Sequence, residues 1–406
     1  MSLTPQGRAA LVAGAAAVGL GLAVGSLLAA ALGASLLAAL AWALLATRAP
    51  RARAARRVGA SIAREGEPVQ VEVGVESLEG ARIEVEDALP PGLEAAEGDL
   101  IGQGARVGLA FAVVARVPGR FVFRGLTARV SDPLGLVERT HVIEAPGEIV
   151  ALPRVEDLRG SLAASRRFLP ASGIHLVGQA GGGSDFFALR DYQPGDTLRD
   201  VNWRASARTG RKLIVSQREM ESQAEATVFL DARGLSRVGT VGNHAWADEL
   251  RALASLAALL ARRRDRPVVV RYGEGVETLR AAPGDAALAG VLASLLAREP
   301  AGGATLREAV DAALPRLRRR APALVLSPLL DDPTVADAVA ALRALELDVV
   351  VLALDGPAFL ALAGEPTEEA RAQRERTLSA LRAHGVRVVD WRLSERLALA
   401  LARGEA

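Results

Sequence analysis

The distribution of apolar and charged positions sets the first region of the chain apart. No residue from Ala9 to Ala46 is charged, and this run is too long for one ordinary membrane span but suits two short ones. The "VGS" segment at Val24–Ser26 is the expected break. It leaves apolar helices at about Ala9–Val24 and Leu27–Ala46, which would reach ~24 and ~30 Å at ~1.5 Å per residue. The pattern therefore predicts a transmembrane helical hairpin, which with its basic flanks occupies residues 1–57.

Charge on the two sides of this hairpin predicts its orientation. Arg8 precedes it, and further arginines follow it, at Arg48, Arg51, Arg53, Arg56 and Arg57. Positive charge on both flanks places both ends on the cytoplasmic side. We therefore expect a multi-pass protein of the inner (plasma) membrane, with its soluble domains in the cytoplasm. A signal peptide cleaved near "ALGAS" is the competing interpretation, but the apolar run is longer and more continuous than a typical signal core.

Alternation with a period of two marks the middle region. In Arg64–Ser77, "REGEPVQVEVGVES", four valines alternate with polar residues or glycine, as expected for a half-buried strand. Further strands are predicted in "RIEVED", "RVGLAFAVVARV" and "GRFVFRGLTARV", with turns at "LPPG" and "SDPLGL". Strands at this spacing predict a small β-sandwich-like domain at residues 58–153, whose expected role is that of a spacer or docking module.

The pattern changes again at Ala226. Short apolar runs without polar alternation predict strands buried on both faces, at "ATVFLD", "PVVVRY", "PALVLS", "DVVVLALD" and "VRVVDW". Residues between them have helical spacing, as in the face formed by Trp246, Leu250, Leu253, Leu256 and Leu260. Alternating strands and helices predict a mostly parallel, Rossmann-like α/β sheet in residues 225–406. Its ligands would bind at strand ends such as Asp231 and Ser327, and residues 154–224 would form a linker with a short helix.

Composition removes several classes of chemistry. The chain has no cysteine, which excludes disulfides, thiolate zinc sites and a cysteine nucleophile, and its four histidines are scattered without a metal-binding pair. Lysine occurs only at Lys212, and beyond the basic N-terminal region acids slightly outnumber basic residues, which argues against nucleic-acid binding. The sequence contains no G-K-[ST] phosphate loop, so we expect no ATP hydrolysis by the chain itself. It also has no G-x-S-x-G nucleophile elbow.

The stretch "LRDYQPGDTLRDVNWRASARTG", Leu189–Gly210, concentrates charge around two of the chain's few aromatic residues. "QPGD" predicts a turn, after which Thr197 can cap a helix that runs to about Arg208. On such a helix Arg199 and Trp203 would be four residues apart, a spacing that permits stacking of the guanidinium on the indole.

Three interpretations of this charged stretch are open. No nucleophile, metal set or histidine accompanies its acids, which weakens an enzyme interpretation, and the acids roughly cancel the arginines that a phosphate site would use. A structural network fits best, in which Arg190, Asp196, Arg199 and Trp203 dock the linker on the α/β domain. A surface that faces a partner is the close alternative. The like charges Arg204 and Arg208 would need an acid, from Asp191 or Asp196.

Four patterns together resemble the bacterial family called domain of unknown function 58. They are the paired N-terminal spans, "GRFVFRGLTARVSDPLGL" followed by "VALPRV", a core of the form R-x-Y-x-x-G-D-x-x-R-x-x-x-W, and a C-terminal region similar to von Willebrand factor A domains. The core falls on Arg190, Tyr192, Gly195, Asp196, Arg199 and Trp203, with Arg208 after it. The resemblance implies a von Willebrand factor A-like fold at 225–406. Because such proteins are commonly encoded beside MoxR-type AAA+ ATPases, it also implies such an ATPase and client proteins as partners.

The resemblance also bears on metal binding. Von Willebrand factor A domains often bind Mg²⁺ through a D-x-S-x-S loop, whose oxygen ligands suit this hard ion. Here the loop reads "DARGLS": Asp231 matches, Arg233 stands in place of the first serine, and Ser236 is one position late. Asp331 lies just beyond the later strand end at Ser327. We expect a degenerate site without metal or other cofactor, in which an arginine could occupy the cation's place, although Mg²⁺ binding by Asp231, Ser236 and Asp331 stays open.

Together with the family resemblance, these observations predict a membrane-anchored cytosolic adaptor or assembly factor. It would be the partner of a MoxR-type ATPase and would bind client proteins through its von Willebrand factor A-like domain. No residue is assigned a catalytic role. The alternative is a metal-dependent hydrolase that uses Asp231, Asp331 and Asp332 at the strand ends. That alternative requires the three carboxylates to converge on one ion in a cleft.

Overall fold

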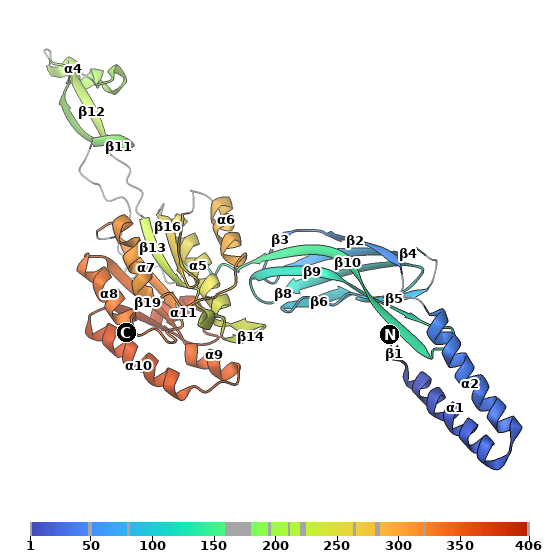
Figure 1. Cartoon of the computed structure of the whole chain (residues 1–406). Helices are drawn as coiled ribbons and strands as arrows, with labels where there is room; N and C mark the ends of the chain where they lie inside the picture. The colour runs from blue at the N-terminus through green and yellow to red at the C-terminus, as the bar shows by residue number, and fades with distance from the viewer. Residues whose placement is uncertain are drawn as a thin grey trace. The chain divides into compact units, whose positions relative to one another are not determined.

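Two apolar helices begin the chain, α1 (Pro5–Val24) and α2 (Leu27–Ala46), drawn in blue in Figure 1. Thr4 caps the start of α1 with its side-chain oxygen. Gly25 ends α1 in the left-handed region, with a φ of 72°, and Ser26 caps α2. The predicted break between the spans is therefore confirmed, and each helix is long and apolar enough to cross a membrane.

The computed structural model describes residues 2–47, 51–78, 82–158, 180–193, 196–209, 212–219, 225–262, 265–280, 285–319 and 321–403. The chain folds into two compact units, Met1–Leu152 and Pro153–Ala406.

Glycines bring the two helices into backbone contact. A Cβ atom on Gly21 of α1 would lie 2.4 Å from the backbone nitrogen of Ala30, and one on Gly33 of α2 would lie 2.7 Å from the carbonyl oxygen of Gly14. Real side chains do not tolerate such distances, so small residues set the close approach of the helices.

The middle region forms two sheets. One contains β1 (Ser2–Leu3), β3 (Ile62–Arg64), β5 (Ile83–Glu86), β7 (Ile101–Gly104), β9 (Gly119–Ser131) and β10 (Val137–Leu152). The other has the order β2 (Ala52–Val58), β4 (Pro68–Ser77), β8 (Arg106–Ala115) and β6 (Leu93–Gly98). All pairings are antiparallel except that of β3 with β10. The alternating valines of β4 are buried, as predicted.

An arginine of the predicted basic flank belongs to this β region instead. The strand β2 begins at Ala52, before the predicted domain start at Val58, and the side chain of Arg56 is fully buried beside Asp87. Its Nη2 donates to both Asp87 carboxylate oxygens, at 2.7 and 2.8 Å, and its guanidinium lies 4.2 Å from the ring centre of Phe123. Because β2 and Phe123 belong to different sheets, Arg56 links the two sheets.

The second unit is built on a twisted α/β sheet. Its strands are β13 (Glu225–Asp231), β16 (Arg266–Tyr272), β17 (Val276–Arg280), β18 (Pro322–Ser327), β19 (Asp348–Leu354) and β20 (Arg387–Trp391). They lie in the order β17-β16-β13-β18-β19-β20, and only the pairing of β17 with β16 is antiparallel. The prediction missed β17, a half-exposed edge strand without a clear apolar run.

Helices connect these strands (Figure 1): α5 (Ala245–Arg262), α6 (Asp285–Leu296), α7 (Leu306–Ala313), α8 (Val335–Ala344), α9 (Gly356–Leu362), α10 (Glu368–Ala383) and α11 (Leu397–Arg403). The predicted apolar face of α5 is buried from Trp246 to Leu260. Ahead of this sheet in the chain, β11 (Ala180–Asp191) pairs with β12 (Ile214–Glu219), and α4 (Trp203–Thr209) lies between them in sequence.

Candidate functional site

The sheet places the predicted strand-end residues at its switch point. In chain order the strands run 3-2-1-4-5-6, so the order reverses between β13 and β18, and α/β sheets bind ligands outside the carboxyl ends of strands at such a point. Asp231 ends β13 and Ser327 ends β18, and both are completely buried. The Ser327 hydroxyl donates to Asp231 Oδ2 at 2.8 Å, so the two predicted residues meet.

Arg233 occupies the space beside this pair. Its Nε donates to Asp231 Oδ1 at 3.0 Å, and its Nη2 donates to Asp231 Oδ2 at 2.8 Å. The guanidinium also donates to the backbone carbonyls of Leu330, at 2.8 Å, and Asp331, at 2.9 Å. A planar fork thus binds a carboxylate on one side and two loop carbonyls on the other. The guanidinium of Arg233 therefore lies directly beside Asp231, the first residue of the "DARGLS" loop.

The electrostatics of this pair follow from its burial. Burial alone would lower the pKa of Arg233, but the hydrogen bonds and charge of Asp231 outweigh this effect and raise that pKa. The side chain of Arg233 is 5% exposed and that of Asp231 is inaccessible. Breaking such a pair from one side leaves a buried charge without compensation.

The later acids do not converge with Asp231. Asp331 accepts a hydrogen bond from Arg233 through its carbonyl oxygen, and the backbone of Asp331 has a positive φ of 45°. The Asp332 carboxylate accepts hydrogen bonds from the N–H of Leu306, at 3.0 Å, and from the N–H and hydroxyl of Thr334, at 2.9 and 2.6 Å. The carboxylate of Asp332 therefore organises the loop after β18 and the start of α7.

Three buried residues near the pair carry polar atoms without partners, and the sequence analysis singled out only Ser236 among them. Both Glu249 oxygens, the Ser236 hydroxyl and the Tyr272 hydroxyl have no hydrogen-bond partner among the described residues. Burial, with the nearby charge of Asp231 as the next cause, raises the pKa of Glu249 and of Tyr272. Ser236, a predicted metal candidate, is buried without bonding to Asp231. Within the described ranges, no group of three or more His, Cys, Asp or Glu side chains could hold a metal ion.

A groove of about 920 Å³ is lined in part by Leu330 and Asp331 of the loop after β18. Leu235, Leu330 and Leu360 supply apolar surface, and its remaining walls are Asp331, Glu365, Pro366, Thr367, Glu368, Glu369, Ala370 and Gln373. Four carboxylate residues and no basic residue are among these described lining residues. The groove thus combines apolar surface with negative charge, next to the loop that Arg233 binds.

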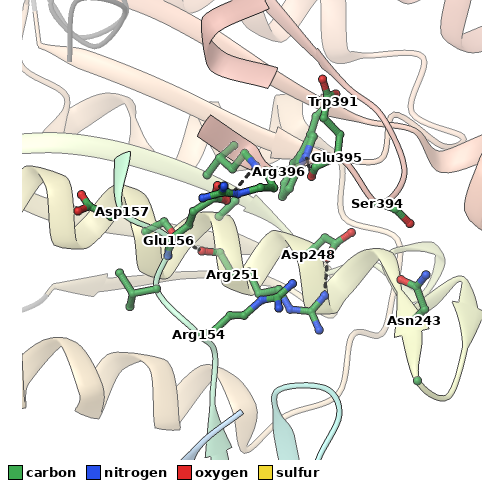
Figure 2. Close-up of a pocket in the computed structure, with 15 residues that line it drawn as sticks. Arg154, Glu156, Asp157, Asn243, Asp248, Arg251, Trp391, Ser394, Glu395 and Arg396 are labelled. Carbon is green, nitrogen blue, oxygen red and sulfur yellow. Dashed lines mark hydrogen bonds and ion pairs between the residues drawn. The ribbon is translucent and has the colours of Figure 1, made fainter. Parts of the chain in front are cut away.

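A second, polar pocket of about 630 Å³ is lined in part by the segment with which the second unit begins (Figure 2). Glu156 accepts hydrogen bonds from Arg396 Nε, at 3.0 Å, and from the N–H of Leu397, at 2.9 Å, and its own N–H donates to the Ser255 hydroxyl at 2.9 Å. Since Leu397 begins α11 and Ser255 lies on α5, Glu156 joins the segment Pro153–Leu158 to two helices.

The charged stretch forms part of a two-stranded hairpin. Arg190 binds Asp196 with two hydrogen bonds of 2.7 and 2.6 Å, and these bonds, followed by that from the Gln193 N–H, lower the pKa of Asp196. Lys212 pairs with Asp191 at 2.7 Å. Both acids are therefore engaged by partners other than the predicted arginines of α4. Gly195 lies outside the described residues.

The single helix predicted across this stretch is wrong. Leu198–Asp200 form a 3₁₀ turn, Val201 then pairs with Val215 of β12, and α4 begins at Trp203. Asn202 caps α4 by accepting the N–H of Ala205 at 3.0 Å. Strand pairing at Val201 interrupts the helix, so Arg199 and Trp203 lack helical i,i+4 geometry.

The side chains of the remaining motif residues differ in exposure. The Thr197 hydroxyl donates a hydrogen bond to the Asp200 carboxylate. Trp203 is 62% exposed, Arg199 and Arg208 are also exposed, and Tyr192 is half-buried. Whether the hairpin docks on the α/β sheet stays a prediction.

Comparisons with known proteins match the region of the chain that contains this site. The model of the family described as "Protein of unknown function DUF58" matches residues 188–357, which include the hairpin motif, Asp231, Arg233 and Ser327. The chain is 27% identical over 154 residues to the "Uncharacterized protein YeaD" of Bacillus subtilis, a match that covers 36% of this chain and 38% of that relative. The resemblance to the domain of unknown function 58 family is thereby confirmed.

Two solved structures give weaker matches, each covering 25% of this chain. One is the FixG-related protein from Vibrio parahaemolyticus, with 8% identity, a TM-score of 0.17 and 95% of that chain covered. The other is a non-cellulosomal cohesin from Archaeoglobus fulgidus, with 14% identity, a TM-score of 0.17 and 91% of that chain covered.

Proposed function

We propose that this chain is a membrane-anchored binding protein whose C-terminal unit, von Willebrand factor A-like in its fold, recognises partner proteins. A MoxR-type AAA+ ATPase is the expected partner, and client proteins are the expected cargo of that partnership. The fork of Arg233 at the switch point carries the proposal. It supplies a fixed internal cation where such a sheet would otherwise bind a ligand, and it holds the loop that forms one wall of the acidic groove.

The chemistry of the groove supports a peptide-like partner. Leu235, which is 40% exposed, suits an apolar side chain, and four carboxylate residues suit a segment that carries arginine or lysine. Glu365, Glu368 and Glu369 are exposed, so a partner can reach them. The groove thereby favours recognition over acid-base chemistry.

The two apolar helices support anchoring in a membrane. Arg8 and Arg51 are exposed at the two ends of the helical hairpin, and positive charge there favours a cytoplasmic location of both ends. In this arrangement the β region of the first unit and the whole second unit would lie on the cytoplasmic side of the inner membrane.

Affinity capture from detergent-solubilised cells under ATP-trapping conditions tests this function. The unmodified chain should recover an AAA+ ATPase, identified by mass spectrometry, and Glu365→Arg combined with Glu369→Arg should reduce that recovery at least tenfold. Glu375→Arg is the matched control, because Glu375 is exposed on α10, the helix that carries Glu369, but does not line the groove. Absence of any AAA+ ATPase from the capture, or equal loss with the control variant, would count against the proposal.

A further inference from the structure

The turn between β9 and β10 is joined to the foot of the helical hairpin, within the first unit. The Thr4 N–H donates to the carbonyl oxygen of Leu136 at 3.1 Å, and the Thr4 hydroxyl donates to the carbonyl oxygen of Gly135 at 2.6 Å. Ser2 and Leu3 pair with the first residues of β10. The chain just before α1 is therefore bonded to the turn Ser131–Leu136.

The end of α2 contacts the same place. Leu40 and Ala43 form a buried cluster with Leu136 and Val137. Arg139 Nη2 also lies 3.4 Å from the carbonyl oxygen of Leu44, near the carboxyl end of α2, where a cation is favoured by the helix dipole. Both helices thus meet the turn at the ends that enter and leave the apolar segment.

The contact is tight enough to hold the turn in place. A Cβ atom on Gly7 would lie 2.0 Å from the carbonyl oxygen of Leu136, so the backbone of α1 rests directly on the turn. Within the turn, Asp132 accepts the N–H of Leu134 at 2.9 Å and that of Val137 at 2.6 Å. Gly135 supplies the left-handed residue, with a φ of 67°.

This ordered turn presents apolar side chains outward. Leu134 is 54% exposed, whereas Leu136 is 9% exposed and packs on α2. The neighbouring Pro133 is exposed as well. Removing the side chain of Leu134 from water into an adjacent apolar phase would be favourable.

We propose that the turn Ser131–Leu136 is a membrane-contact element, with Leu134 seated in the interfacial layer of the bilayer that α1 and α2 cross. The inference rests on the proposed membrane anchoring. If the apolar segments cross the bilayer, their ends near Thr4 and Ala46 lie at its boundary with water, and the turn bonded to those ends lies at the same depth. The lipid that surrounds the helices is therefore continuous with the surface that Leu134 faces.

This contact gives the β region a defined role. The strand β10 leaves the turn at Val137 and ends at Leu152, the last residue of the first unit. Sixteen strand residues span at most ~50 Å at ~3.3 Å per residue. A turn held at two points, by the helices and by lipid, would keep this strand from pivoting at the membrane surface, so that the β region acts as an oriented spacer.

Site-specific fluorescence quenching tests the proposal, since a chain without cysteine accepts one label at a time. Leu134→Cys, Val12→Cys and Val122→Cys variants of the full chain carry a bimane label in phosphatidylcholine–phosphatidylglycerol nanodiscs. Part of the lipid bears a nitroxide near the glycerol end of the acyl chain. Val12 lies on α1 and is 69% exposed, and Val122 is 45% exposed on β9, nine residues and ~30 Å before the turn.

We expect strong quenching at positions 12 and 134, at least threefold above that at position 122. Quenching at position 12 together with position 134 no more quenched than position 122 would overturn the membrane contact while leaving the anchoring intact. No quenching at position 12 would instead overturn the anchoring, and with it this inference. Binding of a protein partner to the turn would appear as protection of position 134 from a water-soluble quencher without any lipid quenching, and would also refute the proposal.

Discussion

At the scale of single residues, two buried arginines carry more of the architecture than the exposed ones. Arg233 is bonded on both sides, to Asp231 and to two carbonyls of the loop after β18. Arg56 joins two sheets through Asp87, where burial lowers the pKa of Arg56 and raises that of Asp87 in spite of their mutual attraction. Exposed pairs such as Arg237–Glu299 are screened by water.

Arg233→Met should therefore be strongly destabilising, because it leaves the Asp231 carboxylate buried without its partner. We expect a loss of about 3–5 kcal/mol in the free energy of unfolding, measured by urea unfolding of the full chain in detergent with tryptophan fluorescence. Arg237→Met is the matched control from the same loop, for which we expect a loss below about 1 kcal/mol. Equal losses in the two variants would show that Arg233 is not a structural fork.

His244 should make stability depend on pH. Burial, followed by the charges of Arg237 and Arg251, lowers the pKa of His244 from 6.5 to about 3, and its Nδ1 accepts the N–H of Ala247 at 3.1 Å. Between these values the unfolded chain binds a proton that the folded chain does not, so the contribution of His244 is complete above pH 6.5 and is lost as pH falls.

His244→Asn tests this dependence, because asparagine can accept the same helix-capping bond without titrating. Lowering the pH from 6.5 to 5 should cost the unmodified chain about 2 kcal/mol more than the variant, at ~1.4 kcal/mol per pH unit. The test compares the free energy of unfolding of the two proteins, measured across this pH range. Parallel pH profiles would contradict the assignment of the effect to His244.

At the scale of elements, the contact between α1 and the β9–β10 turn is the distinctive joint of the first unit. Backbone atoms meet there because Gly7 has no side chain, while a Cβ atom on Gly19 of the same helix would have no neighbour within 4 Å. A methyl group would therefore clash with the turn at Gly7 but would meet no neighbouring atom at Gly19.

Gly7→Ala should separate the turn from α1, whereas Gly19→Ala should be tolerated. We expect hydrogen exchange at the amides of Thr4 and Val137 to rise at least tenfold in the first variant, because the methyl group would collide with the Leu136 carbonyl. Exchange in the second variant should match that of the unmodified chain in the same nanodiscs. If hydrogen exchange at these amides rose in both variants, the cause would be a general loosening of the helical hairpin and not the contact at Gly7.

At the scale of the whole molecule, the chain passes from its first unit to its second through a short anchored segment. Leu158 is buried, and Glu156 bonds to Arg396 and to the start of α11. The second unit thus begins with a segment that Glu156 fastens to the start of α11 and, through the Ser255 hydroxyl, to α5 (Figure 2).

Glu156→Ala should release this segment without unfolding the sheet. Amide exchange at Leu397 and Ala398, whose N–H groups point to the Glu156 carboxylate at 2.9 and 3.4 Å, should rise at least fivefold, while exchange in β13 and β18 stays unchanged. Glu375→Ala, on the exposed face of α10, should alter neither region. Unchanged exchange at α11 in the Glu156 variant would show that the segment is held by other contacts.

Local pattern alone was sufficient for the elements whose signal is carried by neighbouring residues. The helical break at Gly25, the valine alternation of β4 and the buried face of α5 follow from spacing and capping that a few residues determine. The position of Asp231 and Ser327 at one sheet edge was also predictable, since parallel strands bring their carboxyl ends together.

Contacts between distant segments required the tertiary structure. Val201 pairs with Val215 and so interrupts a helix that its own neighbours favour, and Arg56 belongs to a sheet core because Asp87 and Phe123 surround it. The buried Glu249 and Tyr272 carry no sequence motif, and their surroundings come from separate elements. Local sequence thus determined the two apolar helices and the elements with strong apolar periodicity. The hydrogen bonds of Arg233 and the contact of the β9–β10 turn with α1 depend on long-range packing, which no local window contains.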